Sequence, residues 1–332
     1  MQLPFLLTLL AAVNCSSESI SALHNQQLQT VLDDLIERND RPTETDWGYF
    51  REICSNRKKQ RHCAEIFDYF HTVLVPLEFP QVPTPPVMWS DWYGAAMPKH
   101  GVVPHYFRDT RTTQTFGDDS QTIEGDFMIV SDGITRDPDS DFFSFQIVEF
   151  LRVTLPRLNR TVSVEEELYR AAKAVEELLV EVRLPGAATL SAAYRRDNTL
   201  YVLTLGDSEA RVVRDGQVVY RSPRQRTGRK HEQLAAHRPD SVTRMIIDAI
   251  PIQADDYVLL ATDGLWDNLS EADVVAEVVG TVKVAARSVM ERALQAKEGK
   301  RQCIRSKDGD KIDVEECVGG RRDDITVLIA KV

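Results

Sequence analysis

The sequence has little that would support thiol chemistry or nucleic-acid binding. Cysteine is scarce, at 5 of 332 residues, and no two cysteines have the Cys-x-x-Cys spacing of zinc or redox sites. Basic residues are outnumbered, 40 against 51 acidic ones, which gives a formal net charge of -11. Because nucleic-acid binding relies on clustered Lys and Arg, this charge argues against such a partner. We interpret the short basic stretches Arg57–Arg61 and Arg221–Lys230 as solvated loops.

The amino-terminal stretch has no basic residue before Arg38. Its apolar run from Met1 to Val13 is too short to cross a bilayer as a mature helix, and small residues follow it. This pattern is typical of a signal peptide, which we expect over residues 1–17, with secretion or retention in the lumen of the secretory pathway. We expect no membrane span. An intracellular or mitochondrial location is the alternative, although a mitochondrial presequence would contain Arg.

The cysteines support the same compartment. Cleavage of the leader would leave an even number, arranged as two local pairs. We therefore expect the disulfides Cys54–Cys63 and Cys303–Cys317. Four unpaired buried thiols in a reducing compartment are the alternative.

The chain has enough apolar sequence, 42% of its residues, for a substantial core. Residues 18–104 are interpreted as a helical arm of unknown role followed by a connector rich in proline and tryptophan. Residues 105–332 form the main domain. Helices are expected there at 141–155, 163–185, 270–279 and 283–297, and antiparallel strands at 189–194, 199–205, 210–213 and 217–220. Residues 298–322 are interpreted as an insertion.

Three apolar runs of the main domain each have an aspartate at one end. Tyr257–Leu260 leads towards Asp263, Phe127–Val130 towards Asp132, and Asp323 precedes Ile325–Ala330. An ionised aspartate beside a buried strand is expensive to desolvate unless it is paired, hydrogen-bonded or bound to a cation. The pattern predicts several carboxylates at one edge of a sheet, where hard divalent cations find the oxygen ligands they prefer.

Five short motifs together resemble a known family. They are Gly117–Asp119, Ser131–Gly133, Leu205–Ser208, Ala261–Asp267 and Arg322–Thr326. In this order and approximate spacing they are similar to the PPM family, the metal-dependent serine/threonine protein phosphatases of type 2C. The closest likeness is to the PTC-seven-type branch, and the resemblance covers about residues 105–332.

The resemblance implies an α+β fold, a sandwich of two antiparallel β-sheets flanked by α-helices, with a two-metal centre for Mn²⁺ or Mg²⁺ at one end. By the family pattern the catalytic inner ligands are Asp132, the carbonyl of Gly133, Asp263 and Asp323. The remaining acidic positions have outer roles, with Asp118 and Asp119 holding metal-bound water and Asp207 and Asp267 forming a third, accessory cation position. The implied reaction is hydrolysis of phosphoserine or phosphothreonine in a phosphorylated protein substrate by a metal-activated water.

Two positions depart from the family pattern. A histidine proposed as general acid in many members is replaced by Ile134, and the nearest candidate for a phosphate-binding arginine is Arg111. Two alternative functions therefore stay open: a catalytically silent binding or regulatory protein on the same fold, and a phosphatase for small molecules. The sequence does not predict the oligomeric state.

Overall fold

The computed structural model describes residues 17–38, 41–56, 59–79, 89–101, 103–108, 112–134, 139–159, 162–227, 230–300, 302–308 and 311–332. The expected leader and Arg111 lie outside these residues. The chain divides into two compact units, Met1–Leu74 and Val75–Val332. Among the described residues, no helix combines the length and apolar character needed to cross a membrane.

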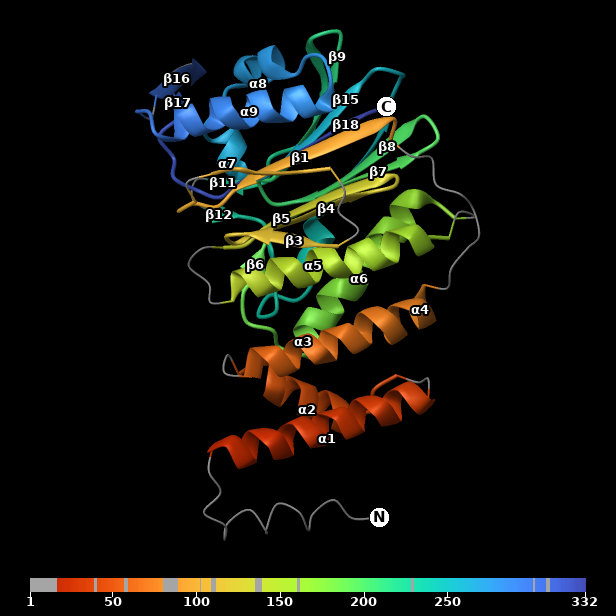
Figure 1. Cartoon of the computed structure of the whole chain (residues 1–332). Helices are drawn as coiled ribbons and strands as arrows, with labels where there is room; N and C mark the ends of the chain where they lie inside the picture. Colours follow the sequence, from red (N-terminus) through yellow and green to blue (C-terminus); the bar gives the residue numbers. More distant parts are fainter. Residues whose placement is uncertain are drawn as a thin grey trace. The chain divides into compact units, whose positions relative to one another are not determined.

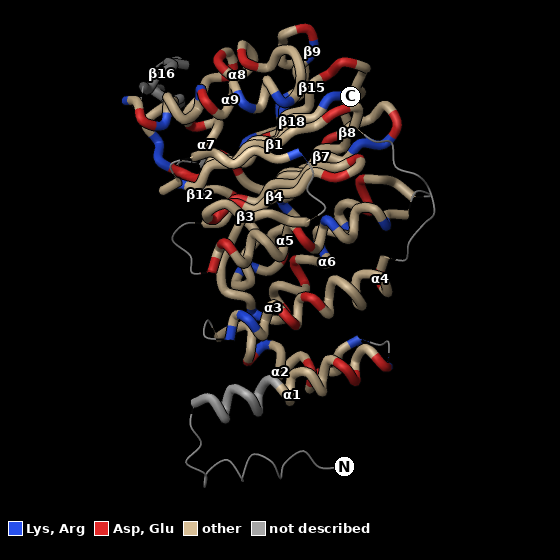
Figure 2. Tube along the Cα trace, in the orientation of Figure 1, with Lys and Arg blue, Asp and Glu red and all other residues tan. Residues whose placement is uncertain are grey.

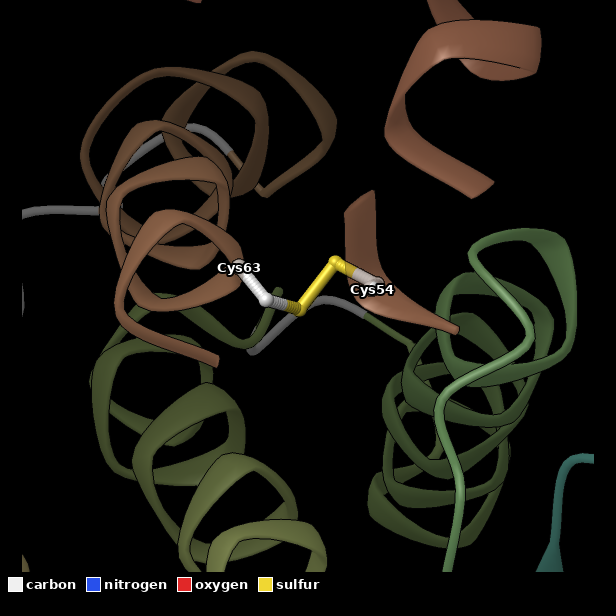
Figure 3. Close-up of a disulfide and its surroundings, with 2 residues drawn as sticks. All are labelled: Cys54 and Cys63. Atoms are coloured by element: carbon white, nitrogen blue, oxygen red, sulfur yellow. A yellow bond between two sulfur atoms is a disulfide. The ribbon is translucent and has the colours of Figure 1, made fainter. Parts of the chain in front are cut away.

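The first unit is helical, as expected for the arm. It contains α1 (Ser17–Arg38), α2 (Glu44–Cys54), α3 (Gln60–Tyr69) and a π-helical turn, η3 (Phe70–Leu74). Thr43 caps α2, and its side chain and backbone exchange hydrogen bonds with Asp46. A disulfide joins Cys54, at the end of α2, to Cys63 in α3, which confirms that expected pair (Figure 3).

The second unit contains two six-stranded antiparallel sheets (Figure 1). The first has the order β10-β9-β15-β18-β1-β2 and the second the order β14-β8-β7-β5-β4-β3. The strands of the first sheet are β1 (Asp91–Met97), β2 (His105–Phe107), β9 (Glu209–Arg214), β10 (Gln217–Arg221), β15 (Tyr257–Ala261) and β18 (Ile325–Lys331). Those of the second are β3 (Gln114–Phe116), β4 (Asp119–Glu124), β5 (Phe127–Asp132), β7 (Leu190–Arg196), β8 (Thr199–Leu205) and β14 (Ile246–Pro251).

Helices cover the outer faces of both sheets (Figure 1). α5 (Ser140–Thr154) and α6 (Val164–Glu181) lie on the second sheet, whereas α7 (Asp263–Trp266), α8 (Glu271–Glu277) and α9 (Val282–Lys297) lie on the first. Shorter elements complete the unit: α4 (Val75–Glu78), η4 (Leu155–Arg157), η5 (Ser241–Arg244), β6 (Ala187–Ala188), β11 (Arg226–Thr227), β12 (Lys230–His231), β13 (Leu234–Ala235), β16 (Gln302–Asp308) and β17 (Lys311–Val318).

The core has a layer on either side of the first sheet. Buried residues from both sheets, among them Met128, Val202 and Leu260, pack between the two sheets. A second cluster, which includes Leu259 and Val289, lies between the first sheet and α9. Acidic and basic positions are interspersed along the elements of this unit (Figure 2). The expected sandwich of two antiparallel sheets flanked by helices is confirmed.

One part of the organisation differs from the sequence-based expectation. The connector was expected to extend to residue 104, but β1 lies inside that range and pairs with β18 from Asp91↔Lys331 to Met97↔Ile325. The strand β1 was not predicted because prolines and tryptophans surround it in the sequence and its partner, β18, lies more than two hundred residues away. The expected insertion contains the hairpin of β16 and β17, in which Cys303 lies directly opposite Cys317.

Candidate active site

Four strand ends meet at one edge of the sandwich. Asp119 begins β4 and is the register partner of Asp132, the last residue of β5. In the other sheet, Ala261 ends β15 opposite Val327, near the start of β18. The antiparallel pairing therefore places Asp263, just after β15, beside Asp323, just before β18. The expected gathering of strand-end aspartates is present.

Asp119 connects the two sheets. Its Oδ2 accepts hydrogen bonds from the hydroxyl groups of Thr262 and Thr326, each at 2.8 Å. Thr262 directly precedes Asp263, and Thr326 follows the acidic pair that begins at Asp323. Asp119 is 1% exposed, and its Oδ1 has no hydrogen-bond partner. One oxygen of this carboxylate therefore organises the site, while the other is buried without a donor.

Two glycines allow the backbone segments of the site to approach closely. A Cβ at Gly133 would lie 2.6 Å from the carbonyl oxygen of Asp118 and 2.7 Å from that of Ser140. A Cβ at Gly264 would lie 1.7 Å from the carbonyl oxygen of Asp324. Because real Cβ atoms do not come this close to backbone atoms, the residues that follow Asp132 and Asp263 must be glycine in this arrangement.

Asp324 is a structural residue of the site. Its carboxylate accepts hydrogen bonds from the backbone N–H groups of Asp118, at 2.9 Å, and of Lys99. The backbone carbonyl of Asp118 in turn accepts from the N–H of Gly133, at 3.1 Å. The half-buried Asp118 is therefore fixed between the segments that contain Asp324 and Asp132.

Burial and mutual repulsion disfavour the ionised forms of these aspartates. Desolvation, followed by the charge of Asp324, raises the pKa of Asp119 well above its usual value. Desolvation and the charges of Asp119 and Asp263 do the same to the pKa of Asp132. Desolvation and the charge of Asp207 raise the pKa of Asp263 to about 6, and the nearby Arg321 opposes this shift. The ionised carboxylates of this site would therefore be stabilised by nearby cations.

Arginines supply part of the compensating charge. Arg321 Nη2 lies 2.8 Å from Asp263 Oδ2 and 2.9 Å from Asp323 Oδ2, and its Nη1 contacts Asp267 Oδ2. Arg224 Nη2 lies 2.6 Å from Asp267 Oδ1, and Arg226 Nη1 lies 3.2 Å from Asp267 Oδ2.

The interpretation of Arg221–Lys230 as a solvated loop is therefore wrong for Arg224 and Arg226, which pair with a buried aspartate. The sequence-based analysis missed all three arginines. For Arg321 there was a signal, because it lies two residues before Asp323 in the last motif.

The inner carboxylates fit the expected pair of divalent cations by their chemistry. Among the residues that the structure describes, Asp119 and Asp132 form no ion pair with a Lys, Arg or His side chain, and the buried Asp119 Oδ1 has no donor. Hard cations prefer such oxygens. Within the part of the chain that the structure describes, however, no three acidic, histidine or cysteine side chains are already grouped to hold one ion. Arg321 contacts both Asp263 and Asp323.

The expected accessory cation position, at Asp207 and Asp267, differs from the inner carboxylates. Asp207, in the turn after β8, is 1% exposed, and Asp267 is 4% exposed. Both carboxylate oxygens of Asp267 contact arginines, so this pair does not fit a further cation. Ile134 is half-buried and donates its backbone N–H to the carbonyl of Ala187, and it has no titratable group.

Comparison with known proteins gives consistent matches. The family model described as protein phosphatase 2C matches residues 113–297. The chain is 30% identical over 165 residues to "Protein phosphatase PTC7 homolog fig" of Drosophila simulans, which covers 44% of this chain and 52% of the relative. It is 26% identical over 190 residues to "Probable protein phosphatase 2C 80" of Arabidopsis thaliana, covering 53% and 45%. The chain thus spans about half the length of these relatives.

Solved structures share the fold. The catalytic domain of the serine threonine protein phosphatase PstP, solved with two manganese ions, superimposes with a TM-score of 0.51 at 18% identity, over 72% of this chain and 96% of that one. The photosystem II phosphatase PBCP superimposes with a TM-score of 0.50 at 20% identity, over 65% and 92%. The family model covers more than half of the sequence and includes Asp119, Asp132 and Asp263. The chain belongs to the protein phosphatase 2C family, as its motifs predicted.

Proposed function

We propose that this protein is a Mn²⁺- or Mg²⁺-dependent phosphatase that hydrolyses phosphoserine and phosphothreonine in proteins. The observation that carries the proposal is the convergence of Asp119, Asp132, Asp263 and Asp323 from four strand ends. Family membership supports the reaction class. The structure of PstP with two manganese ions supports the choice of metal.

In this proposal the chain's own residues create a cation site without a nucleophilic side chain. Asp132, the carbonyl of Gly133, Asp263 and Asp323 would hold two cations, which when bound would supply the Lewis acidity that activates water for attack on phosphorus. Asp119, fixed by Thr262 and Thr326, would orient the site with its free Oδ1.

Arg321 has a second role in the proposal. While the site lacks cations, this guanidinium reduces the repulsion between Asp263 and Asp323, which would otherwise disfavour the folded state. Because each of these carboxylates would be needed as a ligand, Arg321 and the cations compete for the same oxygens. The side chain of Ile134 has no titratable group, so the leaving oxygen must be protonated by solvent or by another group.

Substrate class is tested by comparing phosphate release from four kinds of phosphomonoester at equal concentration in Mn²⁺. These are phosphothreonine, phosphoserine and phosphotyrosine peptides and a set of small phosphorylated metabolites. We expect the highest kcat/KM on phosphothreonine and phosphoserine peptides.

The alternatives predict other outcomes. Faster hydrolysis of the metabolites than of any peptide would identify a small-molecule phosphatase. Binding of a phosphopeptide without release of phosphate would identify a silent phosphatase-fold protein. Either result contradicts the proposed function.

We further propose that the protein matures in an oxidising compartment. The Cys54–Cys63 disulfide and the cross-strand register of Cys303 and Cys317 support this proposal. Thiol titration of the natively produced, denatured protein should find these four cysteines unreactive before reduction and reactive after it. Reactivity of all four before reduction would place the protein in a reducing compartment.

A further inference from the structure

One guanidinium nitrogen lies among the three carboxylates that would surround an accessory cation. Arg226 Nη1 is 3.5 Å from Asp207 Oδ2, 3.9 Å from Asp263 Oδ2 and 3.2 Å from Asp267 Oδ2. The three aspartates come from two segments: Asp207 lies in the turn after β8, and Asp263 and Asp267 lie at the two ends of α7. Arg226 therefore places a positive charge where their oxygens converge.

The backbone around Arg226 fixes this position. Arg226 pairs with His231 in the ladder of β11 and β12. The preceding residue, Gln225, donates its N–H to the carbonyl of Gly206 at 2.8 Å, and its Oε1 accepts from the N–H of Gly206 at 2.8 Å. Since Gly206 directly precedes Asp207, these two hydrogen bonds hold Arg226 beside Asp207.

The neighbouring arginine, Arg224, forms an ion pair with a buried glutamate. Glu209 is 0% exposed, and its Oε1 lies 3.7 Å from Arg224 Nε, while Arg224 Nη2 contacts Asp267 Oδ1. Asp267 Oδ2 is shared by Arg226 and Arg321. Every oxygen of Asp267 is thus already engaged with a guanidinium.

A divalent cation at this place would need to displace Arg226 and to lie close to Arg224. Repulsion between like charges in a largely buried site opposes both. A cation would therefore compete with Arg226 for the oxygens of Asp207, Asp263 and Asp267, and removal of Arg226 would leave room for it.

We propose that Arg226 is a built-in counter-ion that takes the place of the accessory cation, so that this chain binds only the two inner ions. This inference builds on the proposed two-metal function. In this inference the positive charge of Arg226 neutralises Asp207, Asp263 and Asp267, which a bound metal ion would otherwise do.

The test counts Mn²⁺ ions bound per chain by isothermal titration and by equilibrium dialysis with metal analysis. We expect about two ions in the wild type and in Arg226→Lys, which keeps the charge, and a gain of one weaker ion in Arg226→Ala. The double variant Asp207→Asn/Arg226→Ala should lose the gained ion. Arg292→Ala, which removes an exposed arginine paired with Asp273, is the matched control and should bind as the wild type does.

The difference between Arg226→Ala and the wild type tests this inference separately from the proposed function. An unchanged count in Arg226→Ala, or a third ion already present in the wild type, would overturn the role of Arg226. A gain of one ion above a wild-type count below two would support that role and contradict the two-metal proposal.

Discussion

Asp132→Asn should lower kcat/KM on a phosphothreonine peptide by roughly a hundredfold or more, because it removes a carboxylate that would hold the cations. The same variant should not be less stable in the metal-free protein. Burial and the charges of Asp119 and Asp263 raise the pKa of Asp132 well above its usual value. At neutral pH the ionised carboxylate therefore destabilises the folded state, and a neutral amide relieves this repulsion.

The measurements are steady-state kinetics in Mn²⁺ and thermal unfolding in a chelator. Asp255→Asn is the matched control, since it makes the same chemical change at an exposed residue beyond the opposite end of β15, where Asp255 pairs with Lys331. Wild-type activity in Asp132→Asn would remove this residue from the catalytic site. A large loss of metal-free stability would instead show that its carboxylate is a structural residue.

Gly264→Ala should be the most damaging small substitution at the site. The added Cβ would lie 1.7 Å from the carbonyl oxygen and 2.8 Å from the carbonyl carbon of Asp324, and both are backbone atoms that cannot rotate away. Separating these segments would displace Asp323 from Asp263. We expect a loss of about 3 kcal/mol or more in the free energy of unfolding, together with loss of activity.

Differential scanning calorimetry and the phosphopeptide assay check this result. Gly48→Ala is the control, because no atom lies within 4 Å of a Cβ at Gly48, inside α2. This control should stabilise its own helical unit by roughly 0.5–1 kcal/mol. Wild-type stability and activity in Gly264→Ala would mean that the two segments do not need their close contact.

The parts of the site that could be predicted from sequence are those with a local physical signal. An apolar strand that ends in an aspartate raises the same desolvation problem wherever it occurs, and three such strands indicated one carboxylate cluster. Asp132 and Asp263 could be identified in this way. The disulfide between Cys54 and Cys63 had a local signal as well, because the two cysteines are close in sequence.

The parts that could not be predicted depend on contacts between distant segments. Arg224 and Arg226 lie in a polar stretch with no helical or strand periodicity, and hydrogen bonds between Gln225 and Gly206 decide where they lie. The role of Asp324 depends on the backbone of Lys99 and Asp118. No local pattern reveals such pairs, because their geometry arises only when the two sheets have packed together.

The most direct test of the central claim is phosphate release from a phosphothreonine peptide as Mn²⁺ is returned to the chelator-treated, dialysed protein. The account predicts no measurable activity without metal, and recovery with Mn²⁺ or Mg²⁺ in the wild type but not in Asp132→Asn or Asp263→Asn. Equal rates in the chelator and in Mn²⁺ would contradict the assignment of the aspartate cluster as a two-metal catalytic centre.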